Sequence, residues 1–175
     1  MTFSGRVWRH VPRGAHALHL GFILEATGRW NRQGEYGCLY TALTPAGALA
    51  EYRKHLVRNR LQKPRDLVSI EVTVRPVLDL TELAIQARYA ASLEKMTGDS
   101  DEELEQCRQL ADAARGEGFR AILAPSAAQE GERVLVIYPE GRASDLRLRE
   151  GPDRLAVNHG PTPLVDEHGE VIGQI

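Results

Sequence analysis

Apolar and polar residues alternate most regularly between residues 67 and 74, which read LVSIEVTV. Because successive side chains of a strand point to opposite faces, this period of two predicts a half-buried β-strand. The β-branched run at 133–138, RVLVIY, predicts a more central strand. Two further strands are predicted at 36–43, YGCLYTAL, and at the short apolar stretch 121–124, AILA.

Three segments carry the features of helices. A Thr-Pro pair at 44–45 is typical of an N-cap and first turn, and it predicts a helix over 46–61. Ser100 with Glu103 forms a capping box ahead of an apolar stripe at helical spacing, and two glycines then end that helix. A third helix is predicted over 80–96, LTELAIQARYAASLEKM.

Short strands mixed with helices, without a regular βαβ alternation, favour an α+β fold. The chain has 175 residues, of which 42% are hydrophobic, and this suffices for one well-buried core. We therefore expect a single domain over 1–175. Beyond Gly141 the pattern predicts short strands at 145–149 and 170–175, with a hairpin turn at 166–170.

The charge of the chain argues against two classes of partner. The net charge is −2, so the chain as a whole does not attract nucleic acid or an anionic membrane. The basic stretch 52–65 is interpreted as a solvated helix face, because aromatic stacking partners are sparse. The longest apolar-leaning stretch, 15–26, is too short to span a bilayer, and the N-terminus lacks the apolar run of a secretory signal. We expect a cytoplasmic protein with no direct nucleic-acid or membrane partner.

The residues that most often bind metals are not arranged for it. Cys38 and Cys107 lie far apart in the sequence and outside any metal-binding spacing, so neither a disulfide framework nor a zinc site is expected. The six histidines also lack the spacing of metal ligands. The sequence therefore predicts no metal.

Glu51 is the first candidate for chemistry. It lies two turns into the predicted helix, and the small residues near it leave the carboxylate room to face a cavity. The alternative is a solvated glutamate that pairs with His55 or Lys54, and such pairs contribute little to stability. Spacing alone favours this alternative.

Two further candidates lie in predicted loops. Arg29 stands beside glycines, and its planar fork of donors suits a turn that approaches a phosphate closely; the alternative is a cation–π contact with Trp30. Ser126 follows the strand at 121–124, where ligand-facing groups are common; the alternative is a helix N-cap. A serine hydrolase triad is rejected, because neither a GxSxG elbow nor a histidine base is evident.

Several stretches, in this order, resemble the RES domain family, which is named for its arginine, glutamate and serine. They are RVWRHVP at 6–12, GRWNRQGEYGCLYTALTPAGALAE at 28–51 and GFRAILAPSAAQEGERVLVIYPE at 118–140. The middle stretch is the most specific, and it departs from the family at Ala42, where serine is frequent. The resemblance implies a motif-bearing core of residues 6 to about 140 and a C-terminal extension of about 141–175.

The resemblance also implies a fold and a function. Proteins of this family are typically bacterial toxins of toxin–antitoxin pairs, with a fold similar to that of ADP-ribosyltransferase toxins, a mixed and mostly antiparallel sheet with flanking helices. They cleave the nicotinamide–ribose bond of NAD, as glycohydrolases or phosphorylases, or transfer ADP-ribose to a protein. The implied partners are NAD as substrate, inorganic phosphate or a target protein, and a helix-turn-helix (Xre-like) antitoxin. A non-catalytic antitoxin-binding module is the remaining alternative.

Five residues are implied to line the NAD pocket, namely Arg9, Arg29, Tyr40, Glu51 and Ser126. Of these, Glu51, Arg29 and Ser126 are expected to be catalytic. Glu51 is expected to hydrogen-bond a ribose hydroxyl and to stabilise the positive charge that develops on the ribose. The two arginines are expected to bind the pyrophosphate. Tyr40 is expected to stack on or hydrogen-bond the nicotinamide ribose end, and Ser126 to hold nicotinamide or its ribose in register.

Overall fold

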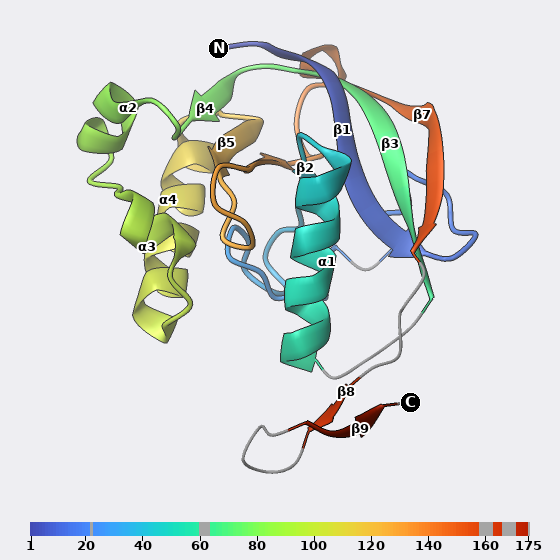
Figure 1. The fold of residues 1–175 in the computed structure, drawn as a ribbon. Coiled ribbons are helices and arrows are strands. Elements are labelled where there is room, and N and C mark those ends of the chain that lie inside the picture. Colours follow the sequence, from blue (N-terminus) through green and yellow to red (C-terminus); the bar gives the residue numbers. More distant parts are fainter. Residues whose placement is uncertain (22, 60–63, 158–162, 166–170, 175) are drawn as a thin grey trace.

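Seven strands form one sheet at the centre of the computed structural model, which describes residues 1–21, 23–59, 64–157, 163–165 and 171–174 (Figure 1). Their spatial order is β4-β5-β6-β2-β1-β3-β7. The bounds are β1 (Phe3–Pro12), β2 (Leu39–Ala42), β3 (Arg65–Val74), β4 (Val77–Asp79), β5 (Ala121–Pro125), β6 (Arg133–Ile137) and β7 (Leu146–Val157). Strands β4 and β5 run parallel, and the other neighbours are antiparallel. The predicted α+β fold with a mixed, mostly antiparallel sheet is confirmed.

The predicted strands at 67–74, 121–124 and 133–138 are confirmed as β3, β5 and β6. Strand β2 is shorter than predicted, because it begins at Leu39 and not at Tyr36. The backbone N–H of Tyr36 donates to the carbonyl of Arg32 within a turn, so it is not part of the strand ladder.

The C-terminal part of the chain contributes one long strand to this sheet. β7 extends well beyond the strand predicted at 145–149, and it pairs with β3 from Val74↔Leu146 to Arg65↔Val157. A separate two-stranded sheet pairs β8 (Pro163–Val165) with β9 (Val171–Gln174), and β9 lies within the strand predicted at 170–175. The hairpin turn predicted at 166–170 lies outside the described residues.

The two longest helices begin where their capping residues predict. α1 (Pro45–Asn59) follows Thr44, whose hydroxyl accepts the backbone N–H of Gly47 at 2.9 Å. α4 (Asp101–Gly116) begins with the complete predicted capping box at Ser100. Capping satisfies backbone donors that have no partner inside the helix, so each cap determines where its helix starts.

The single helix predicted over 80–96 is wrong. The segment forms two short helices, α2 (Leu83–Arg88) and α3 (Leu93–Thr97). Ala90 has a φ of 50° between them, a left-handed conformation that no α-helix continues. The hydroxyl of Ser92 then caps α3 by accepting a backbone N–H of its first turn. The bend lets the end of α3 enter the core, where Met96 is fully buried.

Helices cover the sheet in two places (Figure 1). α1 packs on β1 and β2, whereas α3 and α4 pack against each other beside β5. Leu135 and Ile137 of β6 belong to one buried cluster with Ile70 of β3, and Val136 belongs to a second cluster with Met96. β6 is therefore buried on both faces. Among the described helices, none combines the length and apolar character that crossing a bilayer requires.

Candidate functional site

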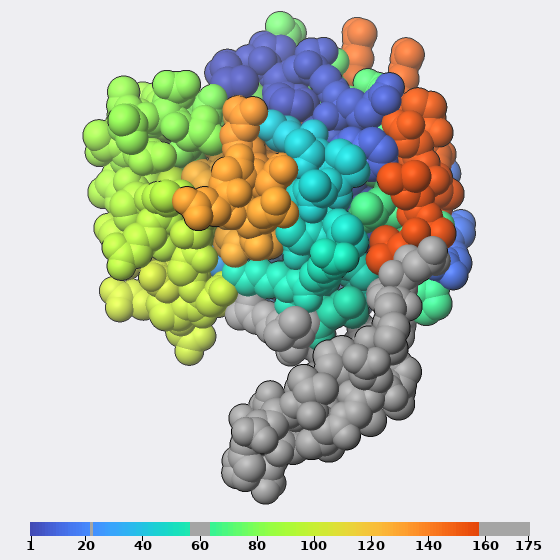
Figure 2. All heavy atoms as spheres, in the orientation of Figure 1, coloured from blue at the N-terminus to red at the C-terminus, as the bar shows by residue number. Residues whose placement is uncertain are grey.

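A cavity of about 550 Å³ opens beside α1, and it brings together side chains from distant parts of the chain. Four of the residues implied by the family resemblance line it: Arg9 from β1, Arg29 from the turn at 28–31, Tyr40 from β2 and Glu51 from α1. Ser126, which directly follows β5, contacts Glu51. The volume is in the range that small-molecule ligands and cofactors occupy. In the space-filling view the turn after β5, coloured orange, lies against α1, coloured cyan (Figure 2).

The Glu51 carboxylate is held in a fixed position by Ser126. The serine hydroxyl donates to Glu51 Oε1 at 2.7 Å, and its oxygen accepts the backbone N–H groups of Ala128 and Gln129 at 3.1 and 3.3 Å. These two N–H groups occupy the acceptor side of the hydroxyl and direct its one proton toward the carboxylate. Ser126 is 5% exposed, so the serine side of this contact is shielded from water, whereas Glu51 is partly exposed at the cavity.

The structure shows contacts of Ser126 and Lys54 that differ from those suggested by the local sequence. Ser126 does not cap a helix, because the residues after it form a turn that its hydroxyl closes. Lys54, one of the two suggested ion-pair partners of Glu51, contacts Asp99 and donates to the carbonyl of Ala127. Glu51 itself lines the cavity and accepts the Ser126 hydroxyl.

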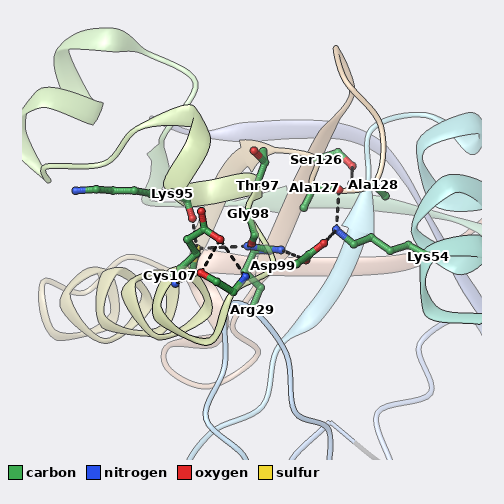
Figure 3. A network of polar contacts seen from close by, with 12 residues as sticks. Arg29, Lys54, Lys95, Thr97, Gly98, Asp99, Cys107, Ser126, Ala127 and Ala128 are labelled. Carbon is green, nitrogen blue, oxygen red and sulfur yellow. Dashed lines mark hydrogen bonds and ion pairs between the residues drawn. The ribbon is translucent and has the colours of Figure 1, made fainter. Parts of the chain in front are cut away.

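Arg29 points from its turn toward the loop between α3 and α4 (Figure 3). Nη1 donates to the carbonyl oxygen of Gly98, and Nη2 forms an ion pair of 2.7 Å with Oδ1 of Asp99. The Arg29 side chain is only 11% exposed. A guanidinium held this firmly presents its donors in one orientation, which suits an anionic ligand group.

Tyr40 shapes the turn that carries Arg29. Its hydroxyl accepts the backbone N–H of Trp30 at 2.8 Å and donates to Asn31 Oδ1 at 3.0 Å. Burial raises the pKa of Tyr40 well above its usual value, so the phenol keeps its proton and remains a donor. The hydroxyl is therefore engaged within the protein, and the part of Tyr40 open to a ligand is its ring.

Replacing Tyr40 by phenylalanine is expected to lower the free energy of unfolding by about 1–3 kcal/mol, because the Trp30 N–H is left without its acceptor. Denaturant titration of both proteins measures this difference. Tyr89→Phe is the control for loss of a phenol hydroxyl at an exposed contact, because the Tyr89 hydroxyl donates to the Glu117 carboxylate near the surface. Equal midpoints for Tyr40→Phe and the unchanged protein contradict the structural role of this hydroxyl.

Arg9 contributes a partly desolvated cation from β1. Nη1 donates to the carbonyls of Ala17 and His19 at 3.3 and 3.2 Å. Burial and the nearby charge of Arg65 lower the pKa of Arg9 to about 10, so the side chain stays charged at neutral pH. Its Nε is buried and has no partner within the described residues. This spare donor at the cavity wall is suited to an anionic or carbonyl group of a ligand.

The neighbouring His10 is uncharged in the folded protein. Its ring packs against Tyr52 with 5.1 Å between ring centroids, and burial, with the charge of Arg65, lowers its pKa from 6.5 to about 3. The unfolded chain therefore binds a proton that the folded protein rejects between these two pH values. The contribution of His10 to the stability is therefore fully present above about pH 6.5, and it is lost as the pH drops toward 3.

His10→Phe is expected to remove this part of the acid sensitivity. The loss in the unchanged protein amounts to as much as about 1.4 kcal/mol per pH unit, and it is measured by urea unfolding at pH 7, 6, 5 and 4. His16→Gln, at an exposed position, serves as the control. Parallel stability curves for His10→Phe and the unchanged protein contradict the assignment.

Sequence reasoning missed the ion pair between Lys54 and Asp99 at the cavity. It treated Lys54 as part of a solvated helix face, and it did not consider Asp99 at all. The spacing i, i+3 from Glu51 places Lys54 on the same side of α1, so this pattern contained the information. Asp99 carries no local pattern of that kind. Among the residues that the structure describes, no group of three or more His, Cys, Asp or Glu side chains is placed to hold a metal ion.

Comparisons with known proteins identify a family, a relative in sequence and a similar fold. A family model described as the RES domain matches residues 6–157. A protein of Mycobacterium tuberculosis named a probable NAD(+) phosphorylase is 28% identical over 174 residues, which cover 95% of this chain and 81% of the relative. The crystal structure of the M. tuberculosis MbcT–MbcA toxin–antitoxin complex contains a chain with the same fold. Its TM-score is 0.72 at 21% identity, over 89% of this chain and 85% of that chain.

Proposed function

The chain belongs to the RES domain family, and on that premise we propose that it is an enzyme that cleaves the nicotinamide–ribose bond of NAD. The observation that carries the proposal is the Glu51 carboxylate, which lines a cavity of about 550 Å³ and is fixed by Ser126 at 2.7 Å. The similarity to a probable NAD(+) phosphorylase supports the same reaction.

Cleavage of this bond builds positive charge on the ribose, as cleavage of a glycosidic bond does. A carboxylate held beside the ribose stabilises that charge without having to reorganise, because the Ser126 hydroxyl already fixes its direction. We assign this role to Glu51, which also hydrogen-bonds a ribose hydroxyl. Ser126 acts in this proposal chiefly by positioning Glu51, and Tyr40 offers its ring to the nicotinamide ribose end.

The negative charge of NAD lies on its diphosphate, and we assign its binding to Arg9 and Arg29. Both line the cavity, and both keep their guanidinium groups in fixed orientations through contacts with backbone carbonyls. Charge-assisted hydrogen bonds from arginine to phosphate are among the strongest polar contacts in proteins. Nicotinamide leaves as a neutral molecule from a cationic ring, so the reaction requires no metal.

The molecule that accepts the ADP-ribose group determines whether the enzyme is a phosphorylase or a glycohydrolase. In phosphorolysis the bond between the nicotinamide nitrogen and C1″, the anomeric carbon of the adjoining ribose, breaks. Its electron pair passes to the ring nitrogen, and an oxygen of hydrogen phosphate bonds to C1″. The ring loses its positive charge as the phosphate loses one negative charge, so no proton needs to move. In hydrolysis a water oxygen forms the new bond and releases one proton, which Glu51 or solvent accepts.

The test is to incubate the purified protein with NAD, with and without inorganic phosphate, and to identify both products. We expect nicotinamide release, with ADP-ribose 1″-phosphate as the second product for a phosphorylase and ADP-ribose for a glycohydrolase. Release only after addition of cell extract assigns the chain to protein ADP-ribosylation. No release with any acceptor overturns the enzymatic proposal and favours a binding module.

We further propose that the chain is the toxin of a toxin–antitoxin pair and acts in the cytoplasm, where it meets NAD. The likeness to a chain of a toxin–antitoxin complex supports an antitoxin partner, and the family resemblance favours a helix-turn-helix (Xre-like) protein. Expression of the chain in bacterial cells is the direct test. Arrested growth with loss of cellular NAD supports the proposal, and normal growth at a comparable protein level contradicts it.

A further inference from the structure

Asp99 bridges two cationic side chains at the wall of the cavity (Figure 3). Its Oδ1 lies 2.7 Å from Arg29 Nη2, and its Oδ2 lies 2.7 Å from Lys54 Nζ. The three residues come from different elements, namely the turn at 28–31, helix α1 and the loop between α3 and α4, and all three line the cavity. Each carboxylate oxygen of Asp99 thus pairs with a different cation, and the two cations lie far apart in the sequence.

The two cations are held by further contacts. Lys54 Nζ donates to the carbonyl of Ala127 at 2.8 Å, and Arg29 donates to the carbonyl of Gly98. The side chains of Arg29 and Lys54 are 11% and 29% exposed, whereas that of Asp99 is 50% exposed. A half-exposed carboxylate gains little from an ion pair, because water and salt compete for it. Of the three groups, the carboxylate is therefore the one that is most easily displaced.

We propose that Arg29 and Lys54 form a binding subsite for a phosphate group, and that Asp99 occupies this subsite in the unliganded protein. Carboxylate and phosphate oxygens accept the same charge-assisted bonds from guanidinium and ammonium groups. A bound phosphate group takes the place of the carboxylate between the two cations. The inference rests on the proposed function, since it identifies how the NAD-cleaving site receives a phosphate.

The subsite lies beside the group assigned to the reaction. Glu51 and Lys54 are three residues apart on α1 and so share one side of the helix. Both are tied to the same turn after β5, because Glu51 accepts from Ser126 and Lys54 donates to the carbonyl of Ala127. Two phosphate sources match this position, the diphosphate of NAD and free inorganic phosphate as the acceptor.

This arrangement predicts effects of opposite sign at Asp99 and Lys54. Asp99→Asn removes the charge that competes for both cations, and it is expected to tighten phosphate binding by about fivefold, the ratio that corresponds to the stronger exposed ion-pair contacts. Lys54→Met removes a donor and is expected to weaken it by about tenfold or more. A purely structural role of the bridge predicts weaker binding in both variants, since both lose the same ion pair.

The experiment is calorimetric titration of the full chain with inorganic phosphate and, separately, with ADP-ribose, neither of which requires turnover. Asp101→Asn is the control for loss of a nearby negative charge, because Asp101 is an exposed aspartate at the start of α4 and outside the cavity lining. Thermal melts of each variant verify that it is folded. A gain in affinity for inorganic phosphate alone assigns the subsite to the acceptor, and a gain for ADP-ribose alone assigns it to the diphosphate of NAD.

Unchanged or weaker binding of both ligands to folded Asp99→Asn overturns the inference. Nicotinamide release by the unchanged protein is measured in parallel, and it separates this failure from failure of the proposed function. Release without the predicted affinity changes removes the Asp99 proposal and leaves the enzyme. The predicted affinity changes without any release support the phosphate subsite and remove the enzyme.

Discussion

Glu51→Gln is expected to lower the rate of nicotinamide release from NAD by about 10²–10⁴-fold, the largest effect expected of a substitution that preserves the fold. Glutamine retains a side-chain oxygen that can accept the Ser126 proton, so the hydrogen bond of 2.7 Å and the fold are preserved. The negative charge that stabilises the developing ribose cation is lost. NAD affinity is expected to change far less than the rate, because the charge matters mainly in the transition state.

The measurement is the initial rate of nicotinamide release at saturating NAD, with NAD affinity determined separately by calorimetry. Glu35→Gln is the matched control, since Glu35 is an exposed glutamate outside the cavity lining. A Glu51→Gln protein that retains the rate of the Glu35→Gln protein removes Glu51 from the reaction. A large loss of affinity with little loss of rate assigns Glu51 to substrate binding alone.

Gly28→Ala is expected to destabilise the protein by about 2–4 kcal/mol and to abolish nicotinamide release. A Cβ at residue 28 would lie 2.1 Å from the Tyr40 hydroxyl oxygen and 2.5 Å from Asn31 Oδ1. Both distances are far below van der Waals contact. Tyr40 must therefore move and give up its bond to the Trp30 N–H, and the turn that directs Arg29 into the cavity loses its support.

The matched control for this prediction is Gly116→Ala. A Cβ at residue 116 meets nothing within 4 Å, and the residue ends α4, so alanine is expected to be neutral or slightly stabilising. Urea unfolding of the two variants gives the comparison, and the nicotinamide assay follows at a temperature where both are folded. Equal stability of the two variants contradicts the close packing of Gly28 against Tyr40.

The elements predicted correctly are those whose cause lies within a few residues. The alternation at 67–74 corresponds to β3, and the capping residues Thr44 and Ser100 start α1 and α4. The helix predicted over 80–96 failed because apolar spacing alone does not detect a left-handed residue such as Ala90. Nor does any local pattern indicate that β1 pairs between β2 and β3, or that β4 pairs in parallel with β5.

In the site, too, local sequence patterns and tertiary contacts account for different features. Helical position alone left Glu51 as either a cavity-facing carboxylate or a solvated one, and the partner that fixes it, Ser126, lies 75 residues away in the sequence. Arg9 and Tyr40 entered only through the family resemblance, since nothing in their immediate neighbours marks them. The Tyr40 hydroxyl is engaged by the Trp30 N–H, a contact that depends on how the turn folds onto β2.

By itself, the sequence determined the secondary structure that hydrogen bonds between near neighbours control, the α+β class and, through its motifs, the family. Only the tertiary structure decided the strand order, the cavity, the partner of Glu51 and the bridge from Arg29 through Asp99 to Lys54. The physical reason is the range of the interactions. Periodicity and capping act over three or four residues, whereas a site is assembled by contacts between segments that approach one another only after the chain has folded.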